Sequence, residues 1–359
     1  MGIKKKYLFT LLLAPSIALS AESELQTLKN QVQILEQKIN ILADQPTNTG
    51  SSSKTYVGGY GELHYNVTDG EDPSFDYHRF VFLLDHEFTP KVKFYSELEV
   101  EHAIAGENQN GEIELEQAYI DWNFTGNWYA RFGMLLQPIG FINETHEPDT
   151  FYGVERPIVE KYIIPTTWWE SGISLGWRPN GWKVDLMVAE GLYDPDGTSI
   201  RSARQKSSET KSQSLSYTLR ADYTAIPGLL LGASLFYQSD LTQGDGPSTP
   251  ATQLSLKAAL QRGPFGLRAL WAQWKLDGAA ARLNNADEQQ GYYIEPSYKI
   301  TDKLGVFTRY SHWYTNTEQR KSRWLSGINY WIHPQVVLKA DIRSEADNNG
   351  YNLGVGYSF

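Results

Sequence analysis

The chain has 359 residues, a formal charge of −10, 13% aromatic residues and no cysteine. The lack of cysteine excludes disulfides, thiolate metal sites and an N-terminal lipoprotein anchor. The acidic balance argues against nucleic acid as a partner. Many aromatic residues with a mean hydropathy of −0.45 are unusual for a soluble enzyme and typical of a membrane barrel with a polar lumen.

Residues 1–21 have the features of an export signal. Three lysines at positions 4–6 precede an apolar stretch, 7–17, that is too short to span a bilayer as a stable helix. Small residues then offer a cleavage site after Ser20 or Ala21. Loss of the three lysines takes the formal charge to −13, and a cysteine-free chain suits the oxidising periplasm.

Residues 22–43 predict one helix with a coiled-coil seam. Apolar residues recur at alternating spacings of three and four. Fewer than three full heptads are marginal alone, but attachment to a trimeric barrel raises their effective concentration. We expect a trimerisation helix, the alternative being an amphipathic helix that lies on its own barrel; residues 44–54 follow as a polar linker. The seam residues are Leu25, Leu28, Val32, Leu35, Ile39 and Leu42.

From residue 55 to residue 359 the hydrophobic period changes to two, and turn signals recur at regular intervals. Short connections alternate with usually longer ones, as in outer-membrane barrels with short periplasmic turns and long external loops. We therefore predict an all-β fold, a 16-stranded antiparallel transmembrane β-barrel. The expected strands are 55–67, 75–88, 91–103, 112–124, 127–137, 170–178, 182–191, 214–224, 228–239, 252–262, 265–276, 290–300, 303–314, 322–332, 335–346 and 350–359.

Alternation within single strands separates a lipid face from a lumen face. In 335–346, Leu338 and Ile342 fall on one side while Asp341 falls on the other. A lysine or arginine on the lipid face near the midplane costs about 2–4 kcal/mol, so charged residues must line the lumen. Opposed acidic and basic walls there create a transverse field that orients charged solutes. The expected lumen residues are Arg79, Glu97, Glu99, Glu101, Arg131, Arg220, Lys257, Arg309, Lys339 and Arg343.

The last expected strand alternates aromatic and small residues and ends on Phe359, with Tyr357 two positions earlier. This ending resembles the C-terminal signal that the outer-membrane insertion machinery reads. We expect that machinery and the lipid of the bacterial outer membrane as partners.

The longest connection, 138–169, is the third external loop. It is rich in aromatic, aliphatic and proline residues, so it gains more by folding into a wide lumen than by remaining in water. We expect its charged residues to form the narrowest point of a pore; the alternative is that the loop caps the trimer axis. The candidates are Glu144, His146, Glu147, Asp149, Glu155, Arg156, Glu160 and Lys161.

Catalytic motifs do not assemble along the chain. The segment 144–147 is not a zinc motif, because the two histidines at positions i and i+4 are missing. Ser311 and His312 are neighbours in an expected strand and therefore point to opposite faces. We expect no catalytic residue, metal or cofactor, and no enzymatic activity.

Several segments resemble the phosphate-selective porin O and P family and its relatives with an N-terminal coiled coil, including dicarboxylate-type channels. The most specific piece is an Arg-Phe-Gly strand that runs into a third loop with the pair Glu155-Arg156. The resemblance implies a homotrimer of 16-stranded barrels with the third loop folded inward; in phosphate-selective members an arginine ladder and lysines draw anions through. The segments are YGELHY (60–65), RFVFLLDHEF (79–88), QAYIDWNF (117–124), ARFGMLLQPIGF (130–141) and GVERPIVEKYIIPTTWWESG (153–172).

These observations favour an outer-membrane porin, a water-filled channel for passive diffusion of small charged solutes such as phosphate, dicarboxylates or other small ions. The alternative is a plugged structural or adhesive barrel that anchors the outer membrane through its coiled coil; only the porin would conduct. The alternation of residues along each strand does not tell which charged side chains lie at the same depth in the lumen, because that depth depends on barrel shear.

Overall fold

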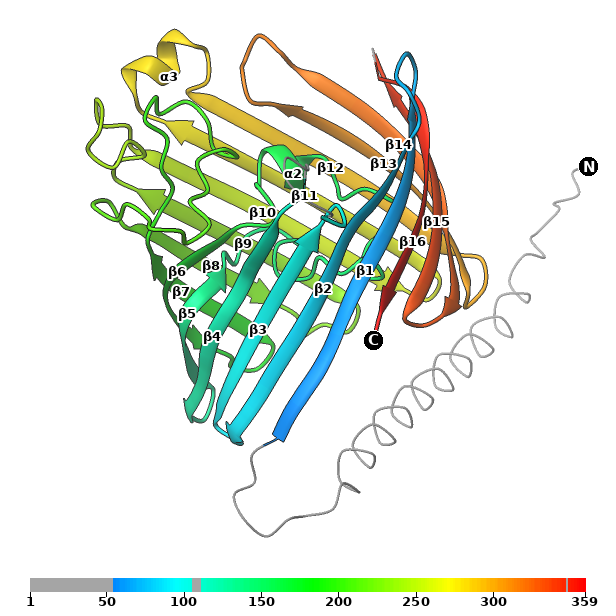
Figure 1. Cartoon of the computed structure of the whole chain (residues 1–359), viewed down its shortest axis with the longest axis horizontal. Coiled ribbons are helices and arrows are strands. Elements are labelled where there is room, and N and C mark those ends of the chain that lie inside the picture. The colour runs from blue at the N-terminus through cyan, green and yellow to red at the C-terminus, as the bar shows by residue number, and fades with distance from the viewer. Residues whose placement is uncertain (1–53, 105–110, 347) are drawn as a thin grey trace, which may run out of the picture. The chain divides into compact units, whose positions relative to one another are not determined.

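The computed structural model describes residues 54–104, 111–346 and 348–359. The expected signal peptide, the heptad helix and the linker up to residue 53 lie outside these residues. Sixteen antiparallel strands close into a barrel in which each strand pairs with its neighbours in sequence, and β1 pairs with β16 (Figure 1). The strands are β1 Lys54–Thr68, β2 Ser74–Thr89, β3 Val92–Glu101, β4 Ile113–Thr125, β5 Trp128–Leu136, β6 Trp169–Trp177, β7 Trp182–Ala189, β8 Ser216–Tyr223, β9 Leu229–Gln238, β10 Ala251–Arg262, β11 Phe265–Leu276, β12 Glu288–Lys299, β13 Leu304–Tyr314, β14 Lys321–His333, β15 Val336–Glu345 and β16 Gly350–Ser358.

The predicted fold class is confirmed, and each strand end lies within two residues of its expected position. The strand ends could be predicted because nearly all of the short turns contain glycine or proline. Gly181, between β6 and β7, has a φ of 83°, in the region that favours glycine. The backbone carbonyl of Gly181 accepts a hydrogen bond from the backbone N–H of Thr224, which lies in the next short turn.

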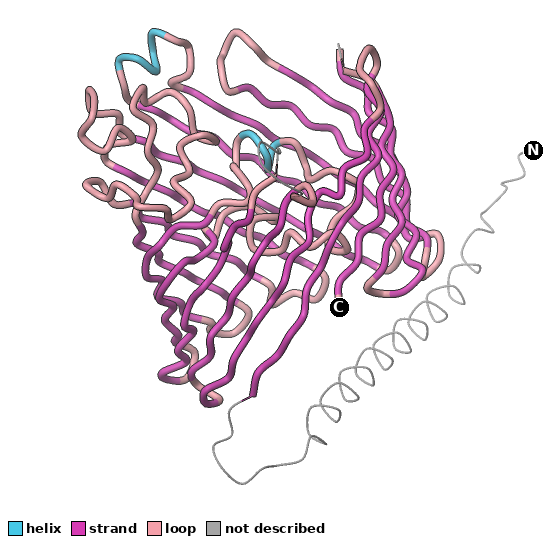
Figure 2. Tube along the Cα trace, in the orientation of Figure 1, coloured by secondary structure: helices cyan, strands magenta, loops and turns pink. Residues whose placement is uncertain are grey.

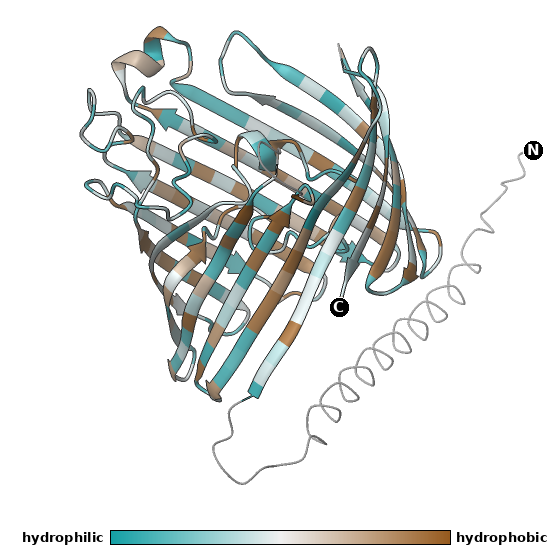
Figure 3. Cartoon of the chain, in the orientation of Figure 1, coloured by the Kyte–Doolittle hydropathy of each residue, from teal (hydrophilic) through white to brown (hydrophobic). Residues whose placement is uncertain are grey.

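Apolar and polar residues alternate along the strands (Figure 3). On β15, Leu338 and Ile342 are exposed on the outer surface, whereas Lys339 and Asp341 are buried inside the barrel. Trp128 and Trp177 stack at 5.7 Å between ring centroids on the outside, near the short turns. This is the pattern of a barrel with an apolar band, aromatic residues at its margin and a polar lumen.

Within the described residues, two short helices lie in the long connections. Helix α3, Ala279–Leu283, lies in the connection between β11 and β12 at the long-loop end. Helix α2, Val159–Tyr162, belongs to the connection between β5 and β6 and lies within the barrel (Figure 2). In the described part of the chain, no helix combines the length and apolar character needed to cross a membrane.

Candidate functional site

The third loop, residues 137–168, enters the barrel (Figure 2). Its hydrogen bonds reach several strands of the inner wall. One anchor is His146, which is 3% exposed. Its Nε2 lies 3.1 Å from a carboxylate oxygen of Glu116 and 3.2 Å from one of Glu97. Its backbone carbonyl accepts a hydrogen bond of 2.6 Å from Arg79, which also donates to Glu62.

The His146 imidazole faces only acceptors among these contacts. Its Nδ1 lies 3.2 Å from the carbonyl oxygen of Asn143, on the side opposite the two carboxylates. Burial opposes protonation of the ring, but Glu97 and Glu116 outweigh it and raise the pKa of His146 to about 10. His146 is therefore an imidazolium at neutral pH and forms a buried ion pair between the loop and β3 and β4.

The middle of the loop crosses to the opposite wall. The backbone N–H of Val154 donates to Asp341 on β15 at 2.7 Å, and Arg309 on β13 donates to the carbonyl of Tyr152 at 2.6 Å. The carboxylate of Asp149 accepts from the Ser358 hydroxyl on β16 at 2.9 Å. Polar groups at the lumen face of distant strands therefore hold the loop backbone, which satisfies groups that would otherwise be buried without partners.

Glu160 fixes the shape of the loop from within. Its carboxylate accepts the backbone N–H groups of Phe141 and Ile142, each at 2.8 Å, and the hydroxyl of Tyr293 at 2.6 Å. Gly140 precedes this turn with a φ of 75°, and a Cβ there would lie 2.5 Å from Glu160 Oε2. Glycine is therefore required for the close approach.

An apolar cluster packs the other side of the loop against the barrel. Ile163 and Trp168 from the loop join Phe236 of β9 and Trp274 of β11, all of them buried. The indole N–H of Trp274 also donates to the Ile163 carbonyl at 2.7 Å. Such a cluster inside a polar lumen gives the loop a hydrophobic reason to remain folded there.

A cavity of about 530 Å³ lies beside the loop toward the long-loop end, and we call it the vestibule. Its walls carry opposite charges. Carboxylates come mainly from β1 to β4, and basic groups come from the third loop, from segment 201–206 and from β14 and β15. The acidic lining residues are Glu62, Asp76, Glu101, Glu112, Glu114 and Glu155, and the basic ones are Arg156, Lys161, Arg201, Arg204, Lys206, Arg323 and Arg343.

Several of the basic groups have no carboxylate partner among the described residues. Arg201 donates to the carbonyls of Lys161 and Thr166, and Arg204 donates to that of Thr167. The Nε of Arg156 is buried without a hydrogen-bond partner within the described ranges. Burial and the neighbouring Arg201 lower the pKa of Arg204 to about 10, so the group stays charged at neutral pH in a position that an anion would stabilise.

The structure distributes the expected constriction residues over different places. Glu155, Arg156 and Lys161 line the vestibule. Glu144 lines a second cavity of about 290 Å³ with Arg220, to which it is paired. The other expected constriction residues make the contacts that hold the loop in place, or lie beside a residue that does: His146, Glu147, Asp149 and Glu160.

The ten expected lumen residues all lie on strands, at positions that face the inside of the barrel. Glu101 and Arg343 line the vestibule, and Arg131 lines the second cavity with Arg220. The others are almost fully buried between the wall and the loop: Arg79, Glu97, Glu99, Lys257, Arg309 and Lys339.

Sequence reasoning missed two groups that the structure brings together. Arg201 and Arg204 stand with Lys206 in one short segment, and this density of basic residues in a long loop was an available signal. Glu116 completes the His146 site, and it follows Glu112 and Glu114 with the period of two that marks a lumen wall.

A closed barrel with an apolar outer band and an inward third loop defines an outer-membrane channel of the porin class. The chain matches the family described as phosphate-selective porin O and P over residues 57–342, and it belongs to that family. The family and the fold are those of channels rather than enzymes. A protein of Aquifex aeolicus (strain VF5), described as uncharacterized, is 32% identical over 357 residues, covering 84% of this chain and 79% of the relative.

Three solved structures with a similar fold are distant in sequence. The anion-selective porin from Comamonas acidovorans has a TM-score of 0.62 and 13% identity, with 86% of this chain and 100% of that chain covered. The outer membrane channel DcaP of Acinetobacter baumannii has a TM-score of 0.58 and 12% identity, with coverage of 88% and 99%. The trimer form of OmpT of Vibrio cholerae has a TM-score of 0.57 and 12% identity, with coverage of 86% and 99%.

Proposed function

We propose that this outer-membrane channel passes small anionic solutes, such as phosphate or dicarboxylates, by passive diffusion. The observation that carries the proposal is the basic wall of the vestibule, where Arg156, Arg201 and Arg204 lack carboxylate partners among the described residues. Guanidinium groups bind carboxylate and phosphate oxygens through paired N–H donors. The carboxylates across the vestibule supply the opposite sign, so a solute would enter an oriented field.

The vestibule also contains compensated charge that does not favour anions. Lys206 pairs with Glu112 at 2.6 Å and with Glu114, and Arg323 pairs with Glu345. These pairs leave Arg156, Arg201 and Arg204 among the vestibule's basic groups that have no carboxylate partner within the described residues. Anion preference therefore depends on a few residues rather than on the net charge of the chain, which is negative.

We further propose that the channel is a homotrimer held partly by the heptad helix, with the long loops external and the short turns periplasmic. The family resemblance supports a trimer, as does the similarity of the fold to a porin solved in a trimer form. The start of β1 and the end of β16 both lie at the short-turn side, where Phe359 pairs with Gly59. This position supports the proposed orientation.

Planar-bilayer conductance under a salt gradient tests the proposal. We expect current steps in threes and a reversal potential of anion preference. The double variant Arg201→Gln/Arg204→Gln should shift the reversal potential toward cations, because two unpaired positive charges leave the vestibule. Arg282→Gln is the matched control, since Arg282 lies on another long loop and is exposed in a pair with Asp277.

Each alternative result has a definite meaning. Cation preference in the wild-type protein would show that the acidic wall dominates, and the anion proposal would be wrong. A folded, heat-modifiable protein that does not conduct would refute the channel and favour a plugged anchor. An equal shift in the Arg282 control would show that surface charge alone sets selectivity.

A further inference from the structure

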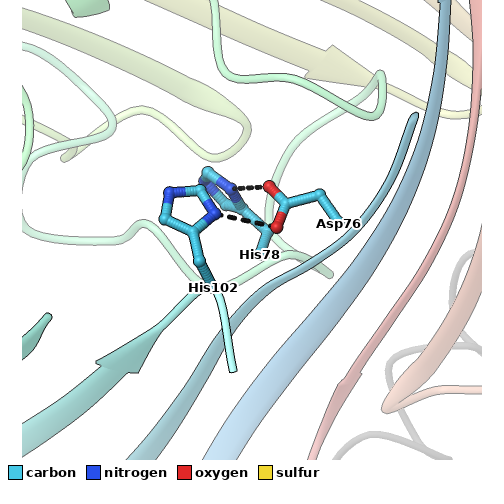
Figure 4. A group of neighbouring side chains, drawn as sticks. All are labelled: Asp76, His78 and His102. Carbon is cyan, nitrogen blue, oxygen red and sulfur yellow. Dashed lines mark hydrogen bonds and ion pairs between the residues drawn. The ribbon is translucent and has the colours of Figure 1, made fainter. Parts of the chain in front are cut away.

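A histidine–carboxylate cluster lies in the vestibule wall, apart from the basic groups invoked above. Asp76 and His78 come from β2, and His102 follows directly after β3 (Figure 4). One oxygen or nitrogen from each of the three side chains lies within 4.8 Å of the others. All three line the vestibule.

A β-bulge places His78 in this cluster. In the pairing of β1 with β2, Glu62 lies opposite Arg79 and His64 lies opposite Asp76, so two residues of β2 face one of β1. Strict alternation would turn either His78 or Arg79 outward, but both side chains face the interior, where His78 stacks on His64 at 4.8 Å between centroids. Bulges re-aim side chains in this way next to functional sites.

The chain reversal after β3 supplies the third side chain. His102 has a φ of 51°, a left-handed conformation uncommon for a residue other than glycine. Its backbone N–H donates to the carbonyl of His78 at 3.0 Å, which ties the two histidine backbones together. The two rings meet edge to face at 5.4 Å between centroids.

The distances from the two imidazole nitrogens to the Asp76 carboxylate are close to those between neighbouring ligands of a metal ion. His78 Nδ1 lies 3.0 Å from one carboxylate oxygen of Asp76, and His102 Nδ1 lies 2.8 Å from the other (Figure 4). Zinc–nitrogen and zinc–oxygen bonds of about 2.1 Å separate neighbouring ligand atoms by roughly 3.0–3.4 Å. An ion could therefore enter among these atoms with small side-chain rotations.

The charges and the access also suit a metal ion. Within the described ranges, no lysine or arginine lies within ion-pair distance of Asp76, whose partners are His78 and His102 alone. The side chains of Asp76, His78 and His102 are 25%, 27% and 35% exposed, so water can complete a coordination shell. Behind the cluster, the ring of His64 beneath His78 is itself held by Glu62 and Glu155 at 3.1 Å each.

We propose that Asp76, His78 and His102 form a site for a divalent transition-metal ion such as Zn²⁺, Ni²⁺ or Cu²⁺ at the mouth of the barrel. Two imidazoles and one carboxylate suit these ions, whereas Mg²⁺ and Ca²⁺ select oxygen ligands. A bound ion joins β2 to the end of β3 and adds positive charge to the acidic wall. The proposal does not depend on which solute the channel passes.

Equilibrium binding to the full-length protein in detergent, purified without a histidine tag, tests the site. We expect calorimetric titration to give one Zn²⁺ per chain, and Mg²⁺ to give no comparable binding. His102→Ala and Asp76→Asn should each weaken Zn²⁺ binding at least tenfold. His86→Ala is the matched control, because His86 lies on the same strand but contacts Thr55 away from the cluster.

A second measurement uses the wild-type protein alone, so it does not depend on the folding of a variant. The electron paramagnetic resonance spectrum of bound Cu²⁺ should show hyperfine coupling to two nitrogen ligands. The proposal is wrong if the folded wild-type protein binds no Zn²⁺. It is equally wrong if heat-modifiable His102→Ala and Asp76→Asn bind as tightly as His86→Ala, which would leave a purely hydrogen-bonded His–Asp cluster.

Discussion

The variant His146→Ala removes the imidazolium that lies between the carboxylates of Glu97 and Glu116. It leaves two buried carboxylates without their cation, in a place where the loop backbone is also held by Arg79. Removing one partner of a buried ion pair costs about 3–5 kcal/mol. We expect the loss to appear as detachment of the third loop from β3 and β4 rather than as unfolding of the barrel.

The pKa of His146 gives the size of the stabilisation by this ion pair and the direction in which it changes with pH. Burial opposes the charge, but Glu97 and Glu116 raise the pKa from its usual 6.5 to about 10, which corresponds to on the order of 5 kcal/mol at about 1.4 kcal/mol per unit. A raised pKa means that this stabilisation is complete below about pH 6.5 and is lost as the pH rises through 10. A loosening of several kcal/mol multiplies the open population of the loop by roughly a hundred or more.

Open-channel current noise in planar bilayers measures this loosening. At pH 7 the wild-type channel should be quiet and His146→Ala should flicker; above pH 10 the wild-type channel should approach the variant. His312→Ala is the control, because His312 bonds Ser322 on the outer surface. If a folded His146→Ala channel is as quiet as wild type at pH 7, the ion pair does not hold the loop.

Two other predictions concern the loop and the oligomer. Gly140→Ala should lower the temperature at which the folded form is lost in heat-modifiability gels and should also raise current noise, because its Cβ would lie 2.5 Å from the Glu160 carboxylate at a positive φ; an unchanged transition would contradict the assigned strain. Val32→Asp with Ile39→Asp should weaken trimers in mild detergent, measured by native gel or cross-linking, without closing the pore, because charges enter the apolar seam. Unaltered trimers would show that the heptad helix does not hold the trimer together.

The barrel could be predicted from sequence because each strand reports its own environment. The range 265–276 was expected and found as Phe265–Leu276, since lipid on one side and water on the other impose alternation on every strand independently. The third loop was identified by its length and apolar content for a similar local reason. These inferences need no knowledge of which residues meet across the lumen.

The contacts within the lumen could not be predicted in that way. His146 meets Glu97 and Glu116 only because barrel shear brings two strands and the loop to one depth. The bulge that turns His78 inward has no signature in the alternation of RFVFLLDHEF, which begins one residue later. Likewise, Glu160 was expected at the constriction, but it is buried among the loop's own backbone N–H groups and Tyr293.

The anchoring of the third loop sets an order of events during assembly. Asp149 bonds Ser358, which is 209 residues later, and Val154 bonds Asp341, 187 residues later. Since those partners belong to the last two strands, they are available only after β15 and β16 have joined the sheet. The part of the loop that contains Asp149 and Val154 is therefore completed late in assembly, whereas His146 already has its partners once β3 and β4 are present.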